Sequence, residues 1–97
     1  MALALTDQKV GRAIAGQASD ELLNIAGIQA SFVLYPEEDQ ACLSARSDGS
    51  INVQVISEML GGGGNAVTAG AQFPGKTPAE VLPQLKAAID KYFDEDA

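Results

Sequence analysis

Apolar residues recur along the first part of the chain at the spacing of one face of a helix. Between residues 6 and 27 they lie three or four positions apart, although Gly11 and Gly16 weaken the segment by their low helix propensity. We expect Thr6 to cap this helix and Gly27 to lie near its end. The apolar stripe that we expect to pack in the core consists of Val10, Ile14, Ala18, Leu22 and Ile25.

Two segments with the composition of strands follow. Residues 28–35 are rich in β-branched and aromatic side chains, and residues 40–46 follow after a polar connection of hairpin length. We therefore expect two antiparallel strands. Alternation along the second strand places Cys42, Ser44 and Arg46 together on one face. Arg46 thus leaves the sheet near the end of its strand, where a ligand could reach it.

The segment that begins at Ser50 has the hydrophobic spacing of a strand and also that of a helix. Its apolar residues alternate from Ile51 to Val55 as in a strand, but they also recur four residues apart up to Met59 as in a helix. We favour a helix, because Ser50 is a suitable N-cap and Gly61 a suitable terminator, and because the segment is long for a strand.

The last part of the chain predicts one strand and one helix. Residues 67–73 can form a third strand, which a Pro-Gly pair ends. Thr77, Pro78 and Glu80 then combine a cap, a proline at the first helical position and a glutamate three residues after the cap. Pro83 interrupts the apolar stripe of this helix, where it can kink the first turns.

Together these elements predict an α/β (α+β) fold. We expect a small mixed sheet of about three or more strands with helices packed on it, in the order α-β-β-α-β-α. A chain of 97 residues has the length of one domain with a modest core. The expected boundaries are a single domain over residues 1–97, with residues 1–5 as an N-terminal extension and residues 94–97 as an acidic tail.

The composition fits a folded protein outside the membrane. Apolar residues make up 46% of the chain and charged residues 20%, which argues against disorder. No apolar run has the length of a membrane span, and the first residues have neither a basic leader nor a cleavage pattern. The lone Cys42 cannot form an internal disulfide and is expected to be a small buried residue. We expect a cytoplasmic location without direct membrane contact.

The net charge of −7 argues against long nucleic acids, because their phosphates bind basic surfaces. The acidic excess, however, lies outside residues 40–76. Within that segment Arg46 and Lys76 balance Asp48 and Glu58. We therefore expect this part of the chain to accept a small phosphorylated ligand and to exclude long duplex DNA.

Four consecutive glycines at residues 61–64 and Arg46 are the candidates for binding such a ligand. Glycine permits the positive φ angles with which successive backbone N–H groups form a nest for phosphate oxygens, and arginine offers a planar fork of donors. The Gly-Lys-Ser/Thr sequence of a Walker loop is absent. The alternatives are a helix cap with a flexible connector for the glycines, and a surface ion pair with Asp48 or Glu58 for Arg46.

Three short motifs follow one another in the middle of the chain. They are Ser-Ala-Arg-Ser at residues 44–47, Ile-Asn-Val-Gln at 51–54 and Gly-Gly-Gly-Gly-Asn at 61–65. In this order they resemble the accessory (DHHA1-type) domain that follows the catalytic domain in DHH-family phosphoesterases. Within the family the sequence is most similar to bacterial cyclic-di-AMP phosphodiesterases. The likeness extends from residues 18–23 to residues 87–93 and covers nearly the whole chain.

The resemblance implies a substrate-binding module for a phosphoesterase that acts on cyclic-di-AMP or short oligonucleotides. It also implies that catalysis resides in a separate DHH catalytic domain that holds manganese, in a parent protein that is often membrane-anchored. This chain has no histidine, and we expect no catalytic residue, no metal site and no hydrolysis by the chain alone. The expected binding residues are Ser44, Arg46, Ser47, Asn52, Gly61, Gly62, Gly63, Gly64 and Asn65.

Asn65 stands where the resembling family has a histidine. Asparagine can donate through its amide but cannot become a cation, so we expect weaker phosphate binding here than in the family. Two other functions stay open. One is a self-associating interaction domain that includes a homodimer, and the other is a tRNA-binding module that resembles the C-terminal domain of alanyl-tRNA synthetase. The acidic charge counts against tRNA.

Overall fold

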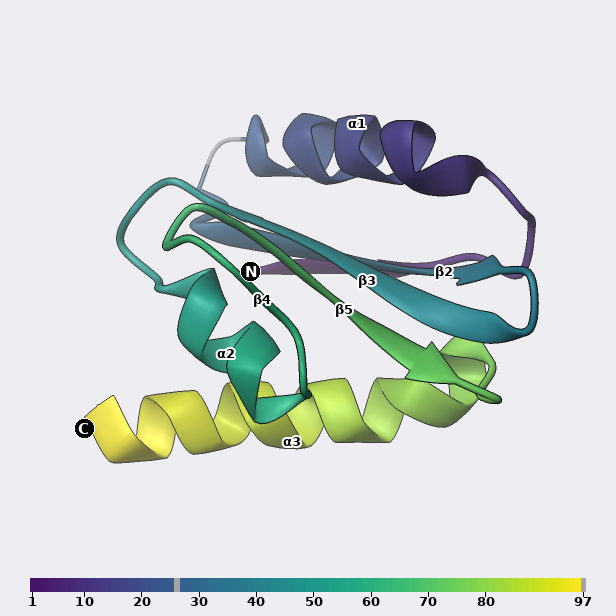
Figure 1. Cartoon of the computed structure of the whole chain (residues 1–97). Helices are drawn as coiled ribbons and strands as arrows, with labels where there is room; N and C mark the ends of the chain where they lie inside the picture. The colour runs from purple at the N-terminus through teal and green to yellow at the C-terminus, as the bar shows by residue number, and fades with distance from the viewer. Residues whose placement is uncertain (26, 97) are drawn as a thin grey trace.

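Five strands form one mixed sheet in the computed structural model, which describes residues 1–25 and 27–96. The order in the sheet is β1-β2-β3-β5-β4, with β1 parallel to β2 and the other neighbours antiparallel (Figure 1). The elements are β1 (Ala2–Leu5), α1 (Gly11–Leu23), β2 (Ala30–Glu37), β3 (Gln40–Ser47), α2 (Val53–Met59), β4 (Gly63–Gly64), β5 (Thr68–Pro74) and α3 (Pro78–Asp96). The expected α/β class with a mixed sheet is confirmed, and β1 and β4 add to the three strands named from the sequence.

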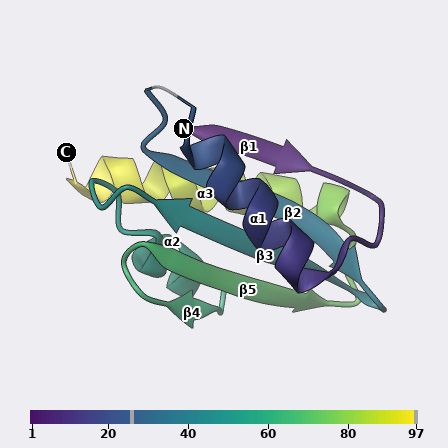
Figure 2. The ribbon, with the colours of Figure 1, turned by 90° about the horizontal axis from the view of Figure 1, so that it is seen from above.

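The helices lie on opposite faces of the sheet. α1 packs on β2 and β3 from one side, whereas α2 and α3 cover the other side (Figure 1). Seen from above, α1 crosses β2 and β3 and leaves β5 and β4 beside it (Figure 2). The half of the sheet formed by β5 and β4 therefore has no helix over it on the α1 side.

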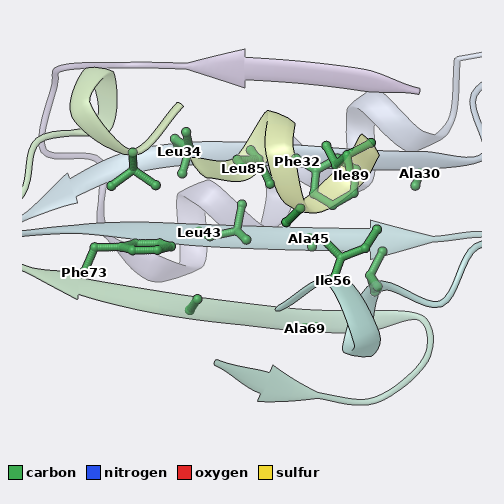
Figure 3. Packing of buried hydrophobic residues seen from close by; sticks show 14 of the residues in the cluster. Ala30, Phe32, Leu34, Leu43, Ala45, Ile56, Ala69, Phe73, Leu85 and Ile89 are labelled. Atoms are coloured by element: carbon green, nitrogen blue, oxygen red, sulfur yellow. The ribbon is translucent and has the colours of Figure 1, made fainter. Parts of the chain in front are cut away.

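The main core fills the space between the sheet and the pair α2 and α3. Phe32 and Leu34 of β2 and Leu43 of β3 point into it and meet Ile56 of α2 and Leu85 of α3 (Figure 3). These positions alternate along the strands, so the intervening residues face α1. There a smaller cluster forms around Ala15, Val33, Tyr35 and Cys42.

The predicted apolar stripe of α1 is only partly buried. Ile14 and Ile25 are 52% and 55% exposed, and the residues that face the sheet most closely are Ala15, Gly16 and Ser19. Small residues let the helix approach the sheet, and Ser19 Oγ donates a hydrogen bond of 3.2 Å to the Ser44 carbonyl. Val10, Ala18 and Leu22 of the predicted stripe pack beside them, so the docking face combines part of that stripe with small and polar residues that an apolar pattern does not reveal.

The ends of the helices also differ from expectation. α1 begins after Val10 without a side-chain cap, and Thr6, the predicted cap, instead accepts a hydrogen bond from the Gln8 N–H at 3.1 Å. α2 begins after Asn52, whose Oδ1 accepts two N–H groups of the first turn at 3.0 and 3.3 Å. The predicted cap Ser50 binds Asp48 instead. α2 is shorter than expected as a result.

The two chain ends belong to secondary structure. Residues 1–5, expected as an extension, contain β1, because β2 offers an unpaired edge beside them and Ala4 packs toward the α1 cluster. Residues 94–96, expected within an acidic tail, continue α3, and Ala97 lies outside the described residues. The predicted start of α3 is confirmed, since Thr77 and Glu80 form reciprocal hydrogen bonds. In the described part of the chain, no helix combines the length and apolar character of a membrane span.

Candidate ligand pocket

A cavity of about 630 Å³ is lined by residues of α1, β2, β3 and β5 together with the four glycines. We call it the arginine pocket, because both arginines of the chain line it. Its lining residues are Arg12, Tyr35, Cys42, Leu43, Ser44, Arg46, Gly61, Gly62, Gly63, Gly64, Thr68, Ala69, Gly70, Ala71, Gln72 and Pro74.

The floor of the arginine pocket is formed by β3 and β5. Cys42 pairs with Gln72 and Ser44 with Gly70, so these side chains share one face of the sheet. A β-carbon on Gly70 would lie 2.6 Å from the Leu43 carbonyl oxygen, a distance that no side chain tolerates. Glycine at this position therefore allows β5 to pack closely against β3.

The four glycines border the pocket, and two of them, Gly62 and Gly64, also allow close backbone packing. A β-carbon on Gly62 would lie 2.0 Å from the Gly70 carbonyl oxygen, and one on Gly64 would lie 2.4 Å from that of Thr68. Gly63 and Gly64 form β4 against β5. The sequence hypothesis weighed a helix cap against ligand contact, and the structure shows a third reason for the run.

The predicted phosphate nest lacks free donors at its first two positions. The Gly61 N–H donates to the Glu58 carbonyl at 3.1 Å, and the Gly62 N–H donates to the Ser57 carbonyl at 2.8 Å. Together with the positive φ of Gly61, these bonds end α2, as the sequence predicted for this glycine. A phosphate in this pocket therefore depends on side-chain donors more than on the glycine backbone.

Arg46 enters the pocket from β3 and is held by several neighbours. Its Nε lies 3.2 Å from Oδ1 of Asp20, and its Nη1 donates to the Ala45 carbonyl at 2.9 Å and to Ser44 Oγ at 3.2 Å. The ion-pair partner is thus Asp20 of α1, not Asp48 or Glu58. Because the Arg46 side chain is 20% exposed and that of Asp20 is 62% exposed, the carboxylate can move into solvent when an anion arrives.

Arg12 is the charged pocket residue that the sequence did not single out. It lies close enough to the buried Tyr35 to oppose the rise of the tyrosine pKa, and Tyr35 in turn interacts with the Cys42 thiol. Burial raises the pKa of Tyr35 and of Cys42 above their ordinary values of 10.0 and 9.0, so both groups are neutral near pH 7. The signal in the sequence was the spacing of Arg12 and Gly16, which places both on one face of α1.

The charge of the pocket is opposite to that of the whole chain. Its lining contains two arginines and no aspartate or glutamate, whereas the chain carries a net charge of −7. The two guanidinium groups give this lining an attraction for anions, which the ion pair of Arg46 with Asp20 reduces.

Three predicted binding residues lie outside the pocket lining, and their side chains form bonds within their own turns. Ser47 Oγ donates to the Ile51 carbonyl and accepts from the Gly49 N–H. Asn52 caps α2, and Asn65 Oδ1 accepts N–H groups two and three residues further on, at 3.0 and 2.8 Å. Ser44, Arg46 and the four glycines are the predicted residues that the fold brings together.

The described residues include no group of three or more histidine, cysteine or carboxylate side chains placed to hold a metal ion. The pocket presents the guanidinium groups of Arg12 and Arg46 as donors that an anion could accept from.

The family model described as the DHHA1 domain matches residues 1–95. The chain belongs to the DHHA1 domain family. This membership confirms the resemblance read from the three sequence motifs.

Two cyclic-di-AMP phosphodiesterases illustrate the relatives of this DHHA1 domain. PdeA of Listeria monocytogenes is 49% identical over 88 residues, which are 90% of this chain and 13% of PdeA. GdpP of Bacillus subtilis is 46% identical over 79 residues, which are 80% of this chain and 12% of GdpP. The DHHA1 domain thus spans about an eighth of the length of these relatives.

Two solved structures share the fold. The C-Ala domain of Aquifex aeolicus alanyl-tRNA synthetase has a TM-score of 0.61 at 20% identity and covers 87% of each chain. The pGpG-specific phosphodiesterase PggH of Vibrio cholerae has a TM-score of 0.50 at 14% identity, over 71% of this chain and 25% of PggH. At these identities both show that the DHHA1 fold is shared and carry no information on ligands.

Proposed function

We propose that this DHHA1 domain binds a phosphate group of a nucleotide in the arginine pocket, as the substrate-binding part of a phosphodiesterase that acts on cyclic-di-AMP or short oligonucleotides. The observation that carries the proposal is the charge of the lining, with two arginines and no acid in a chain of net charge −7. The family and the names of the relatives PdeA and GdpP support the ligand class.

Arg46 is the principal phosphate contact in this proposal. A guanidinium offers two parallel donors to phosphate oxygens, and such charge-assisted bonds are about twice as strong as neutral ones. Asp20 holds the side chain in position until the ligand replaces the carboxylate. Ser44 and the glycine-lined wall supply a small, uncharged surface beside it. A cavity of about 630 Å³ is within the usual range for small-molecule sites.

The domain contributes binding, and hydrolysis belongs to a DHH catalytic domain with manganese ions in the parent protein. The pocket lining contains no histidine and no carboxylate that could act as a general base or hold a metal ion. Substrate held by the DHHA1 domain is positioned for the catalytic domain, which is the usual benefit of a separate binding module.

Calorimetric titration of the chain with cyclic-di-AMP, its linear product pApA, AMP and adenosine tests the proposal. We expect the phosphorylated ligands to bind and adenosine to bind far more weakly, because the arginines recognise phosphate. Incubation with manganese should release no pApA or AMP from cyclic-di-AMP. Equal binding of adenosine, or no binding of any phosphorylated ligand, would contradict the proposed site.

A second candidate function is self-association through β1. This strand lies at the edge of the sheet, and its Leu3 and Leu5 are 38% and 42% exposed. An exposed edge with apolar side chains can pair with the edge of another chain. Size-exclusion chromatography over a range of concentrations, without nucleotide, should then show a dimer that Leu3→Lys dissociates. A monomer at all concentrations would contradict self-association and leave nucleotide binding as the one proposed function.

A further inference from the structure

Arg12 occupies a position that helix stability does not explain. It lies in the first turn of α1, where the helix dipole is positive and a cation is unfavourable. That turn holds no acidic residue, and among the described residues Arg12 forms no ion pair with a carboxylate. The group it acts on is the neutral hydroxyl of Tyr35. The positive charge of Arg12 therefore has no carboxylate within ion-pair distance in the described part of the chain.

The two arginines reach different parts of the arginine pocket. Arg46 Nη2 lies against Gly16 of α1. Gly16 is one helical turn after Arg12, so the positions of these two residues on α1 are about 6 Å apart along the helix axis. On the sheet side, Arg12 reaches the group formed by Tyr35 and Cys42. Cys42 precedes Arg46 by four residues on β3, a separation of about 13 Å along the strand.

The surface between these two positions is uncharged. Ser44 lies midway between Cys42 and Arg46 on the same face of β3, and its partner on β5 is Gly70. The carboxylate of Glu37 raises the pKa values of Tyr35 and Cys42, but Glu37 does not line the pocket. Two separate cationic groups on a neutral floor match a ligand with two separate anionic groups.

We propose that Arg12 forms a second anion subsite of the arginine pocket, which binds one phosphate of a dinucleotide while Arg46 binds the other. This inference rests on the proposed function and deepens it, because it selects ligands with two phosphate groups over mononucleotides. Arg12 is in this view a specificity-determining residue, and Tyr35 lines the same end of the pocket.

The test compares pApA, which has two phosphate groups, with AMP, which has one. Calorimetric titration of Arg12→Gln should show a loss of affinity for pApA of about tenfold, the usual effect of one charge-assisted contact. Affinity for AMP, held by Arg46, should change less than about twofold. Lys9→Gln is the matched control, because it removes the same charge from an exposed residue outside the pocket lining.

Each outcome has a separate meaning. Failure of the unaltered domain to bind either ligand would contradict the proposed function itself. Binding of pApA that is as strong in Arg12→Gln as in Lys9→Gln would contradict the second subsite and leave the proposed function intact. Equal losses for pApA and AMP in Arg12→Gln would place both arginines on one phosphate and would also overturn the inference.

Discussion

A β-carbon added to Gly16 of α1 would lie 2.8 Å from Nη2 of Arg46, so the guanidinium lies directly against the helix backbone. Glycine leaves this space free, although it lowers helix propensity in the middle of α1. Asp20, one turn later on the same helix, holds Nε of the same side chain at 3.2 Å. α1 therefore sets the direction in which Arg46 enters the arginine pocket.

We predict that Gly16→Ala weakens ligand binding without weakening the fold. The added methyl group displaces the mobile end of Arg46, whereas alanine has a helix propensity about 1 kcal/mol more favourable than that of glycine. Calorimetry should show a loss of affinity for pApA of up to about tenfold, with a melting temperature that is unchanged or higher. Gln17→Ala, at an exposed neighbouring position, is the control. An affinity equal to that of the control would contradict the role of α1 in orienting Arg46.

Asp20→Asn should strengthen phosphate binding. The carboxylate beside Arg46 repels an incoming phosphate, and at about 6 Å in water this repulsion is about 0.7 kcal/mol, or about threefold in affinity. Titration with pApA at low salt measures the effect. Glu21→Gln removes a neighbouring exposed charge and controls for net charge. A weaker complex in Asp20→Asn would show that the positioning of Arg46 by this carboxylate outweighs its competition with the ligand.

Asn65→Ala should destabilise the turn between β4 and β5. Its Oδ1 accepts the N–H groups of Val67 at 3.0 Å and Thr68 at 2.8 Å, and both bonds are lost in alanine. We expect the free energy of unfolding in urea to fall by about 1 kcal/mol. Asn65→Asp keeps an acceptor in the same place and should be nearly neutral. Equal stability of the alanine and aspartate variants would show that these bonds contribute little.

The hydrogen bond between Thr77 and Glu80 at the start of α3 should contribute to the loss of folding stability at acidic pH. A hydrogen bond from the Thr77 N–H lowers the pKa of Glu80 below its ordinary value of 4.5. A lowered folded-state pKa means that the stabilisation is complete above the unfolded-state value and is lost as the pH falls through the folded-state value. The melting temperature of the unaltered domain should exceed that of Glu80→Gln near pH 7, and this difference should shrink progressively as the pH falls below 4.5. A difference that stays the same as the pH falls would contradict this assignment.

Features that depend on neighbouring residues were predictable from the sequence. The capping box of Thr77 and Glu80 and the terminator Gly61 are local patterns, and alternation placed Ser44 and Arg46 correctly on one face of β3. These features need no knowledge of the tertiary structure.

Features that depend on distant contacts were missed or misassigned. β1 is a strand because β2 offers it an edge, and the contribution of Arg12 to the pocket depends on how α1 lies across the sheet. Ser50 and Asn52 are both suitable N-cap residues, and Asn52 caps α2 because the chain becomes helical only after it. Gly62 and Gly64 reflect the close approach of the chain to β5, which a sequence motif cannot distinguish from a phosphate nest.

The most direct test of the phosphate-binding role is calorimetric titration of Arg46→Ala with pApA, beside the unaltered domain and Lys76→Ala. Lys76 is exposed and outside the pocket lining, so its removal controls for the loss of one positive charge. Because the ion-pair partner Asp20 is largely exposed, Arg46→Ala should lower the free energy of unfolding by about 1 kcal/mol or less. We predict that Arg46→Ala lowers the affinity by about tenfold or more, while Lys76→Ala binds nearly as the unaltered domain does. Equal affinities in the two variants would contradict the assignment of the arginine pocket as the phosphate site.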